Sequence, residues 1–327
     1  PGIFYHPSMR RWLRMLLYPV GNLRLLRSID VNSPAIVHMQ WTRLPRLDQW
    51  LIAQLHQRGI PVVYTAHDVE PLFSQAFNLS SIYTAVDAII VHAEANRDFM
   101  LQRYPSLSEK VIRVIPHLAS EWVIPPGADR ASARAILSIA PDAQVLLFFG
   151  SSRRYKGLNI LVEAFAQARE ACPSLWLAVA GHLENLQIFS SLPEARLLVE
   201  PNYIPSDQVW IYHLAADLVV LPYSQISQSG ELITAMSFGL PVIATNIGGM
   251  PETINKNGWV VPPNDANALT AAIIDAFSDI PRLRSMGDQS LQLIQERHSP
   301  AQVAQQTIAL YEEIIRCRSV SSTVPIV

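Results

Sequence analysis

Residues 224–252, SQISQSGELITAMSFGLPVIATNIGGMPE, combine a loop of small residues, a short helical pattern, an apolar run and a second glycine turn. The loop ends at Gly230, just before a helical pattern of apolar residues from Leu232 to Met236. The start of a helix leaves backbone N–H donors unpaired and carries partial positive charge. Serine and glycine let an anion approach those donors closely. The stretch therefore predicts an anion site, although an α/β turn without a ligand has the same composition.

The apolar run at residues 241–245, PVIAT, is typical of a central strand in a parallel sheet, and Gly248 and Gly249 predict a tight turn after it. Similar runs occur at 35–39, 61–66, 86–92, 111–115, 145–149, 175–181, 197–199 and 217–223. Helical patterns separate many of these runs, which indicates βαβ units and an α/β fold with parallel sheets. The segment SEWVIPPGAD at 120–129 interrupts the alternation. We therefore expect a linker there between two domains.

Composition limits the classes of function. The chain has 327 residues, of which 50% are hydrophobic and 16% charged, and a net charge of -2, so bulk attraction to nucleic acid is not expected. No run approaches the 18 or more apolar residues of a membrane span. Two cysteines without a CxxC pair, and no secretory signal, favour a cytoplasmic protein. The pattern at Pro1 begins abruptly, so we expect a strand–helix unit to precede it.

Residues 5–27 form a basic, amphipathic segment with five arginines and no acidic residue. Such a segment can lie on an anionic membrane surface, here the inner face of the membrane. The same pattern also fits a helix that packs on the core and exposes its arginines. The sequence favours the core-packed helix and leaves peripheral membrane contact as the alternative.

Three histidines, His67, His92 and His117, follow three successive predicted strands of the first half. Ligands of parallel α/β sheets bind beyond the carboxyl ends of the strands, so these histidines are candidate site residues. Their spacing does not fit a zinc site.

The loop GSSRRYKG at 150–157 follows a predicted buried strand and holds two cations that suit phosphate oxygens, Arg153 and Lys156. It lacks the spacing of a nucleotide-hydrolysing P-loop. Together with the loop before Leu232, it predicts a diphosphate site. The chain has no Asp-x-Asp pair, so we expect no bound metal and no cofactor. Cations and a helix start would then neutralise the leaving group.

These segments resemble the retaining glycosyltransferases of family 4, which have the GT-B fold. The resemblance rests on FFGSSRRYKGLNILVEAF, PNYIPSDQVWIYHLAADLVVLPYSQISQSG and FGLPVIATNIGGMPE in the second half, and on VVYTAHDVEP, VHAEANRDFM and VIRVIPH in the first. It implies two Rossmann-like domains facing a cleft. These would be residues 1–125 on the acceptor side and 126–298 on the donor side, with residues 299–327 as a helix crossing back to the first domain.

The resemblance also implies a reaction. A sugar passes from a nucleotide diphosphate sugar to a sugar or lipid-linked acceptor hydroxyl, with its anomeric configuration retained. Arg153 and Lys156 would hold the donor diphosphate, and His67 would face the donor sugar. Tyr203 and Ile204 would lie at the nucleobase. The other donor-binding residues that the resemblance implies are Gly150, Gln228, Ser229, Gly230 and Glu231.

One feature departs from many family members, which carry two glutamates where this chain has Ile226 and Thr234. The chain resembles the subset with an SQSG loop, in which Glu231 is the nearby carboxylate. Ribose recognition is therefore open. A non-catalytic subunit that binds a sugar nucleotide or a partner enzyme remains an alternative, as does an epimerase or phosphorylase of the same fold.

Overall fold

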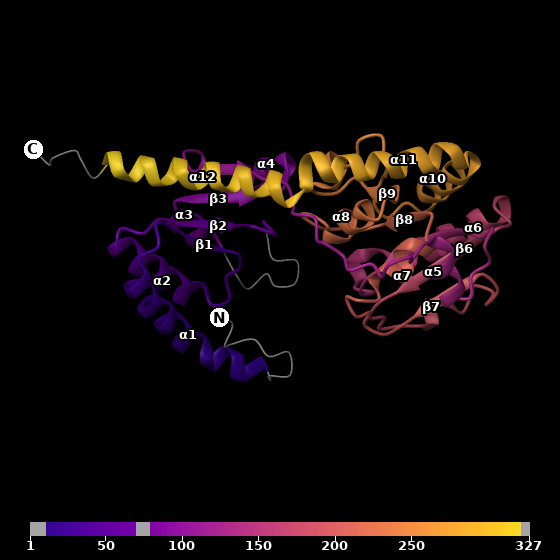
Figure 1. The fold of residues 1–327 in the computed structure, drawn as a ribbon, viewed down its shortest axis with the longest axis horizontal. Coiled ribbons are helices and arrows are strands. Elements are labelled where there is room, and N and C mark those ends of the chain that lie inside the picture. Colours follow the sequence, from indigo (N-terminus) through magenta and orange to yellow (C-terminus); the bar gives the residue numbers. More distant parts are fainter. Residues whose placement is uncertain (1–10, 70–78, 322–327) are drawn as a thin grey trace, which may run out of the picture. The chain divides into compact units, whose positions relative to one another are not determined.

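The computed structural model describes residues 11–69 and 79–321, with side chains described from Leu17 to Arg318 within these ranges. The described chain divides into two compact units (Figure 1). Unit 1 takes in residues 11–69, 79–92, 97–115 and 305–321, and unit 2 takes in 93–96 and 116–304. Each unit holds one sheet whose paired strands are all parallel. The predicted α/β class is thus confirmed.

Unit 1 has a four-stranded sheet in the order β1-β2-β3-β4, with helices before and between its strands. Its elements are α1 (Arg11–Asn32), β1 (Val37–Met39), α2 (Pro45–Gln57), β2 (Val62–Thr65), α3 (Ser80–Ala85), β3 (Ala88–Val91), α4 (Glu94–Arg103), which begins in unit 2, β4 (Val111–Val114) and the later part of α12 (Pro300–Ser321).

The strand register separates two faces of this sheet. Val62, Tyr64 and Ile89 point to a core that they share with α1, α2 and α3. The alternate residues, beginning with His38, point the other way because side chains alternate along a strand. On that second face Tyr311 of α12 contacts His38 of β1, and Glu313 pairs with Arg113 of β4. Helix α12 therefore crosses this face of the sheet. The candidate site residues His67 and His92 follow β2 and β3, at the carboxyl edge of the same sheet.

Unit 2 has a six-stranded sheet in the order β10-β9-β8-β5-β6-β7. Its elements are α5 (Arg130–Ile136), β5 (Gln144–Phe149), α6 (Leu158–Ala171), β6 (Leu175–Ala180), β7 (Leu197–Glu200), α7 (Val209–Ala215), β8 (Leu218–Leu221), α8 (Gly230–Ser237), β9 (Val242–Thr245), α9 (Met250–Thr253), β10 (Gly258–Val261), α10 (Ala266–Ser278), α11 (Ile280–Leu293) and a π-helical turn (Ile294–His298) that leads to α12.

Helices cover both faces of this sheet (Figure 1). Helices α6 and α10 share one apolar core with the sheet, and α5, α7 and α8 share the other. From β5 the chain adds β6 and β7 on one side of the sheet. It then returns to the other side of β5 and adds β8, β9 and β10. The change of direction makes β5 and β8 the switch point of a doubly wound sheet, where ligands of such folds bind. The loops after these two strands are the two that the sequence singles out.

Candidate functional site

The loops that follow β5 and β8 are in direct contact. The backbone N–H of Ser224 donates to the carbonyl oxygen of Tyr155 at 2.7 Å. Gly157 ends the first loop in the left-handed region, with φ 68°, and a β-carbon on it would overlap the carbonyl oxygen of Pro222. The two loops can pack this closely because residue 157 has no side chain.

Replacement of Gly157 by alanine should therefore destabilise unit 2. The left-handed conformation alone costs a non-glycine residue about 1–2 kcal/mol, and the overlap with Pro222 adds to it. We expect a loss of roughly 2 kcal/mol or more in the free energy of unfolding, measured in urea. Gly230→Ala is the matched control, because nothing lies within 4 Å of a β-carbon there. A Gly157→Ala variant as stable as Gly230→Ala would contradict this account of the loop contact.

Lys156 occupies the junction of the two loops. Its Nζ atom lies 5.3 Å from the centre of the Tyr223 ring, a cation–π distance. A β-carbon on Gly150 would come within 2.8 Å of the same atom, so the ammonium group rests against the end of β5. Burial lowers the pKa of Lys156, the nearby Glu231 raises it and Arg153 lowers it again. Within the described residues Nζ makes no hydrogen bond or ion pair. The site therefore holds a largely buried cation suited to an added anion.

Tyr223, whose ring contacts the ammonium group of Lys156, is also part of the candidate site. Its side chain is fully buried, and burial raises the pKa of its phenol far above the usual range. The hydroxyl lies beside Ser229 but has no hydrogen bond of good geometry to any residue that the structure describes. It is a buried polar atom at the site that still has hydrogen-bonding capacity.

Helix α8 begins at this junction, as the small-residue loop predicts. Ser229 caps it, with its hydroxyl accepting from the backbone N–H of Leu232 at 3.2 Å. The Gln228 side chain accepts from the N–H of Ser229 at 2.9 Å. A helix start has four donors without an intrahelical partner, and this cap satisfies the one on Leu232. The N–H groups of Gly230 and Glu231 remain at the partly positive end of the helix.

The Glu231 carboxyl is paired with a histidine that the sequence does not single out. His213 of α7 is fully buried, and its Nε2 lies 2.9 Å from Glu231 Oε1. Its Nδ1 lies 2.9 Å from the carbonyl oxygen of Val209, which can only accept, so Nδ1 carries hydrogen. Nε2 and Oε1 then share one further proton. This hydrogen bond holds the Glu231 carboxyl against α7, near the start of α8.

The other donor-side candidates differ in how near they lie to this group. Gly150 rests against Lys156, and Arg153 is an exposed residue of the same loop. Tyr203 and Ile204 follow β7, two strands away from β5. Tyr203 is exposed, whereas Ile204 is buried in the core shared with α7 and α8.

In unit 1, His67 lies beyond the carboxyl end of β2. Its Nδ1 is 3.1 Å from Nε2 of His92, and its Nε2 is 3.0 Å from Oε1 of Gln40. The Trp41 ring stacks on it, with centroids 4.7 Å apart and planes at 17°. His117, by contrast, belongs to unit 2, where its carbonyl oxygen accepts from His298. Within the described ranges no three His, Cys, Asp or Glu side chains gather as a metal site.

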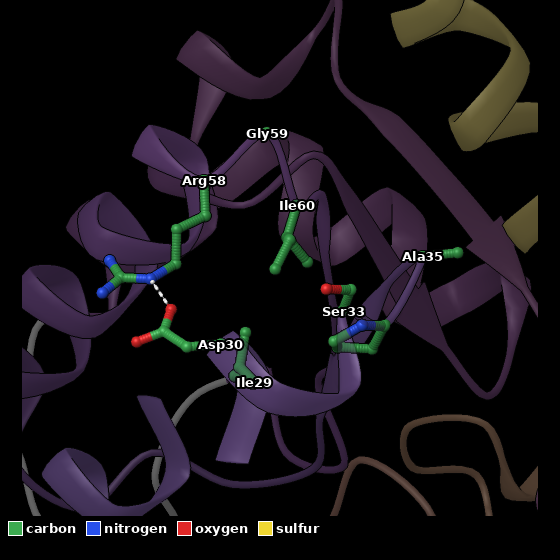
Figure 2. A pocket seen from close by; sticks show the side chains of 8 residues that line it. Ile29, Asp30, Ser33, Ala35, Arg58, Gly59 and Ile60 are labelled. Carbon is green, nitrogen blue, oxygen red and sulfur yellow. Dashed lines mark hydrogen bonds and ion pairs between the residues drawn. The ribbon is translucent and has the colours of Figure 1, made fainter. Parts of the chain in front are cut away.

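A pocket of about 420 Å³ lies at the opposite, amino-terminal end of the unit 1 sheet (Figure 2). Arg58 and Asp30 face each other across one side of it, with Nε 2.7 Å from Oδ1. This hydrogen bond lowers the pKa of the Asp30 carboxyl. Because ligands of parallel sheets bind beyond the carboxyl ends, this pocket is not the candidate active site.

Two family models cover most of the chain. Residues 129–292 match "Glycosyl transferases group 1", and residues 1–118 match "Glycosyltransferase Family 4". A D-inositol 3-phosphate glycosyltransferase of Segniliparus rotundus is 28% identical over 84% of this chain and 65% of that protein. The alpha-maltose-1-phosphate synthase of Mycolicibacterium smegmatis is 27% identical over 78% of this chain and 74% of that protein. The chain spans less than two thirds of the length of several of these relatives.

Solved structures share the fold. Sucrose-phosphate synthase of Thermosynechococcus elongatus has a TM-score of 0.74 at 23% identity, covering 96% of this chain and 81% of that one. HepE of Anabaena, in complex with UDP, has a TM-score of 0.73 at 17% identity, covering 89% and 82%. Both family matches agree with the two parallel α/β units and with the cationic loop at the β5–β8 junction. The chain therefore belongs to the group 1 glycosyl transferases, family 4, with the GT-B fold.

Proposed function

We propose that this chain carries the catalytic units of a retaining glycosyltransferase, which moves a sugar from a nucleotide diphosphate sugar to an acceptor hydroxyl. The observation that carries the proposal is Lys156, a largely buried cation held between Gly150 and Tyr223 at the switch point of unit 2. A buried cation favours an anionic partner. The start of α8 beside it supplies backbone donors to the same anion.

The chemistry follows from the leaving group. The bond between the anomeric carbon and the donor phosphate oxygen breaks, and its electron pair departs with the nucleoside diphosphate. Lys156, Arg153 and the N–H groups of Gly230 and Glu231 stabilise the added negative charge. The acceptor oxygen bonds to the same face of the anomeric carbon, and its proton passes to a donor phosphate oxygen. The hydrogen bond from His213 holds the Glu231 carboxyl in place beside the start of α8.

A solved protein of this fold, HepE of Anabaena with UDP-glucose bound, supports a nucleotide-sugar donor, and the relatives named D-inositol 3-phosphate glycosyltransferases support a hydroxyl of a sugar-like acceptor. For this chain we therefore propose a sugar or lipid-linked acceptor, in polysaccharide, glycan or glycolipid synthesis. No metal is needed in this scheme, because side-chain cations and a helix start take the charge that a divalent ion would otherwise neutralise.

The test is turnover of radiolabelled donors, namely UDP-glucose, UDP-galactose, UDP-N-acetylglucosamine and GDP-mannose, with and without inositol phosphate or a lipid-linked acceptor. A transferase moves label to the acceptor. An epimerase changes the donor sugar, a phosphorylase needs inorganic phosphate, and a non-catalytic subunit leaves every donor intact.

Transfer should continue in EDTA. Loss of transfer in EDTA, with recovery in magnesium or manganese, would refute the metal-free scheme.

We propose that the protein acts in the cytoplasm, with peripheral contact at the inner face of the membrane as an alternative that helix α1 could provide. None of the described helices is both long and apolar enough to cross a membrane. Helix α1 buries Leu26 and Ile29 in the unit 1 core and exposes Arg24, Arg27 and Leu23. Arg10 lies outside the described residues, and the side chains of Arg11 and Arg14 are not described. A helix that packs on the core with one face can still present cations and apolar groups to anionic lipid with the other.

Arg24 and Arg27, changed together to glutamate, should abolish co-sedimentation with phosphatidylserine vesicles. Each arginine near an anionic surface contributes about 1 kcal/mol, so reversal of two charges should lower partitioning by more than tenfold. Salt should also release the parent protein. Arg284→Glu with Arg297→Glu, at exposed positions of unit 2, is the charge-matched control. Equal binding to anionic and neutral vesicles would leave α1 as a structural helix alone.

A further inference from the structure

Six polar side chains gather on the α12 face of unit 1, five from the strands or the residues that follow them and one from α12 itself. Alternation along β1 puts His38 and Gln40 on this face, and the paired positions along β2 and β3 put Thr65, His67 and His92 there too. Tyr311 reaches the face from α12. These side chains lie near one another because the strands are parallel and in register.

The side chains form one continuous hydrogen-bonded chain. His92 Nδ1 lies 2.9 Å from the carbonyl oxygen of Ile115, and His92 Nε2 lies 3.1 Å from His67 Nδ1. Gln40 joins the next two histidines, with Oε1 3.0 Å from His67 Nε2 and Nε2 3.1 Å from His38 Nε2. His38 Nδ1 is 2.5 Å from the Tyr311 hydroxyl, and Thr65 lies 2.7 Å from His38 Nε2.

The donor and acceptor roles can be assigned from one end. The Ile115 carbonyl can only accept, so Nδ1 of His92 carries hydrogen. Nε2 of neutral His92 then accepts, and Nδ1 of His67 donates to it. The remaining nitrogen of His67 faces the Gln40 side chain, which offers one acceptor and two donor hydrogens. The Gln40 amide can therefore form a hydrogen bond with His67 in either protonation state of the histidine.

The protonated and neutral states of His67 require opposite directions for the hydrogen bonds along the chain. Protonated His67 donates to the Gln40 oxygen, the Gln40 NH₂ group donates to His38 Nε2, and His38 Nδ1–H donates to the Tyr311 oxygen. Neutral His67 accepts from the NH₂ group, the Gln40 oxygen accepts from His38 Nε2–H, and the Tyr311 hydroxyl donates to His38 Nδ1. The Thr65 hydroxyl fits both, since it can donate or accept. The Gln40 amide oxygen lies toward His67, an orientation that suits an Nε2–H group on this histidine.

We infer that Gln40 and His38 are positioning residues, which set the protonation state and ring orientation of His67 through this hydrogen-bonded chain to Tyr311. Burial lowers the pKa of His38 and raises that of Tyr311, so both stay neutral near pH 7 and change only their hydrogen positions. Trp41 stacks on the imidazole of His67 and restricts the orientation of its ring plane. The link to catalysis rests on the proposed function and on the placement of His67 at the donor sugar that the family resemblance implies.

Other titratable groups surround the chain. Asp68 follows His67, and burial raises its pKa to about 6. His92 lies on the β3 side, and the Arg113–Glu313 ion pair joins β4 to α12. A titration of His67 therefore has to be compared between variants of one residue, with these groups unchanged.

Gln40→Glu and Gln40→Met provide that comparison. A carboxylate can only accept, so Gln40→Glu should raise the pKa of His67 by about one unit or more. Methionine removes the acceptor, so Gln40→Met should lower it. Histidine ¹⁵N NMR measures the pKa without donor or acceptor, with the signal assigned by its loss in His67→Asn. Gln102→Glu, exposed on α4, is the charge-matched control and should leave the pKa unchanged.

The pH profile of donor turnover should shift in the same direction as the pKa of His67 in both Gln40 variants. A merely structural Gln40 would lower activity at every pH without moving the profile. The inference is overturned if the two variants shift the pKa in the same direction, if neither shifts it, or if the turnover profile stays fixed while the pKa moves. If the parent protein turns over no donor, the proposed function fails, and the NMR titration alone decides whether the chain sets the state of His67.

Discussion

Replacing Lys156 by alanine should weaken UDP binding roughly 10- to 100-fold. A hydrogen bond to a charged group is worth about 1.5–3 kcal/mol, and the burial of Lys156 keeps water from screening it. Arg153→Ala should have a smaller effect, because its side chain is exposed and its contact with phosphate is screened by solvent. Isothermal titration calorimetry with UDP and GDP measures both losses.

The neighbouring Arg154 provides the control, since it is exposed in the same loop and Arg154→Ala should bind UDP as the parent does. Binding should also weaken as pH rises through the pKa of Lys156, which burial holds below the ordinary lysine value. Lys156→Arg should remove that pH dependence, because arginine stays protonated. If Lys156→Ala binds UDP as tightly as Arg154→Ala, the diphosphate site is not at the β5–β8 junction.

Replacing His67 by alanine should lower the turnover number about a hundredfold, with the donor dissociation constant nearly unchanged. General acid–base or polar assistance to a reacting group contributes on the order of 10²–10⁴-fold. The proposed diphosphate contacts are all made by residues of unit 2, so removal of the His67 side chain, which belongs to unit 1, should leave donor affinity nearly unchanged. Separate measurement of the turnover number and the dissociation constant distinguishes the two effects.

His56→Ala is the matched control for His67. His56 lies in the same unit, at the end of α2, and pairs with Asp87 at the amino-terminal side of β3. It should alter stability more than turnover in the folded protein. A His67→Ala variant that loses donor binding and turnover together would instead indicate a structural histidine.

Much of the fold could be predicted because buried parallel strands are apolar along their whole length. β5 and β9 are examples, since both are almost fully buried and flanked by helices. β10 is harder to recognise, because it lies at the sheet edge, begins with Gly258 and exposes Val260. The small-residue loop predicted the start of α8 correctly, because a helix cap depends on local sequence.

The site was only partly accessible from sequence. Arg153 and Lys156 are conspicuous as two cations in one loop after a buried strand. The Glu231–His213 pair is not, because it joins α8 to α7 through tertiary packing, and a lone histidine in a helix carries no motif. Gln40 is likewise hidden: its contact with His67 depends on the register of β1 against β2, which single-sequence patterns do not specify.

Retaining sugar transfer is tested most directly by the configuration of the sugar that the protein releases. Carbon-13-labelled UDP-glucose, UDP-galactose, UDP-N-acetylglucosamine and GDP-mannose, all α-linked donors, are incubated with the protein while NMR follows the anomeric carbon. With an acceptor, or slowly with water, we predict that the first product from one of these donors is the α-anomer. No turnover of any donor, or a β-anomer formed first, would contradict a retaining sugar transferase.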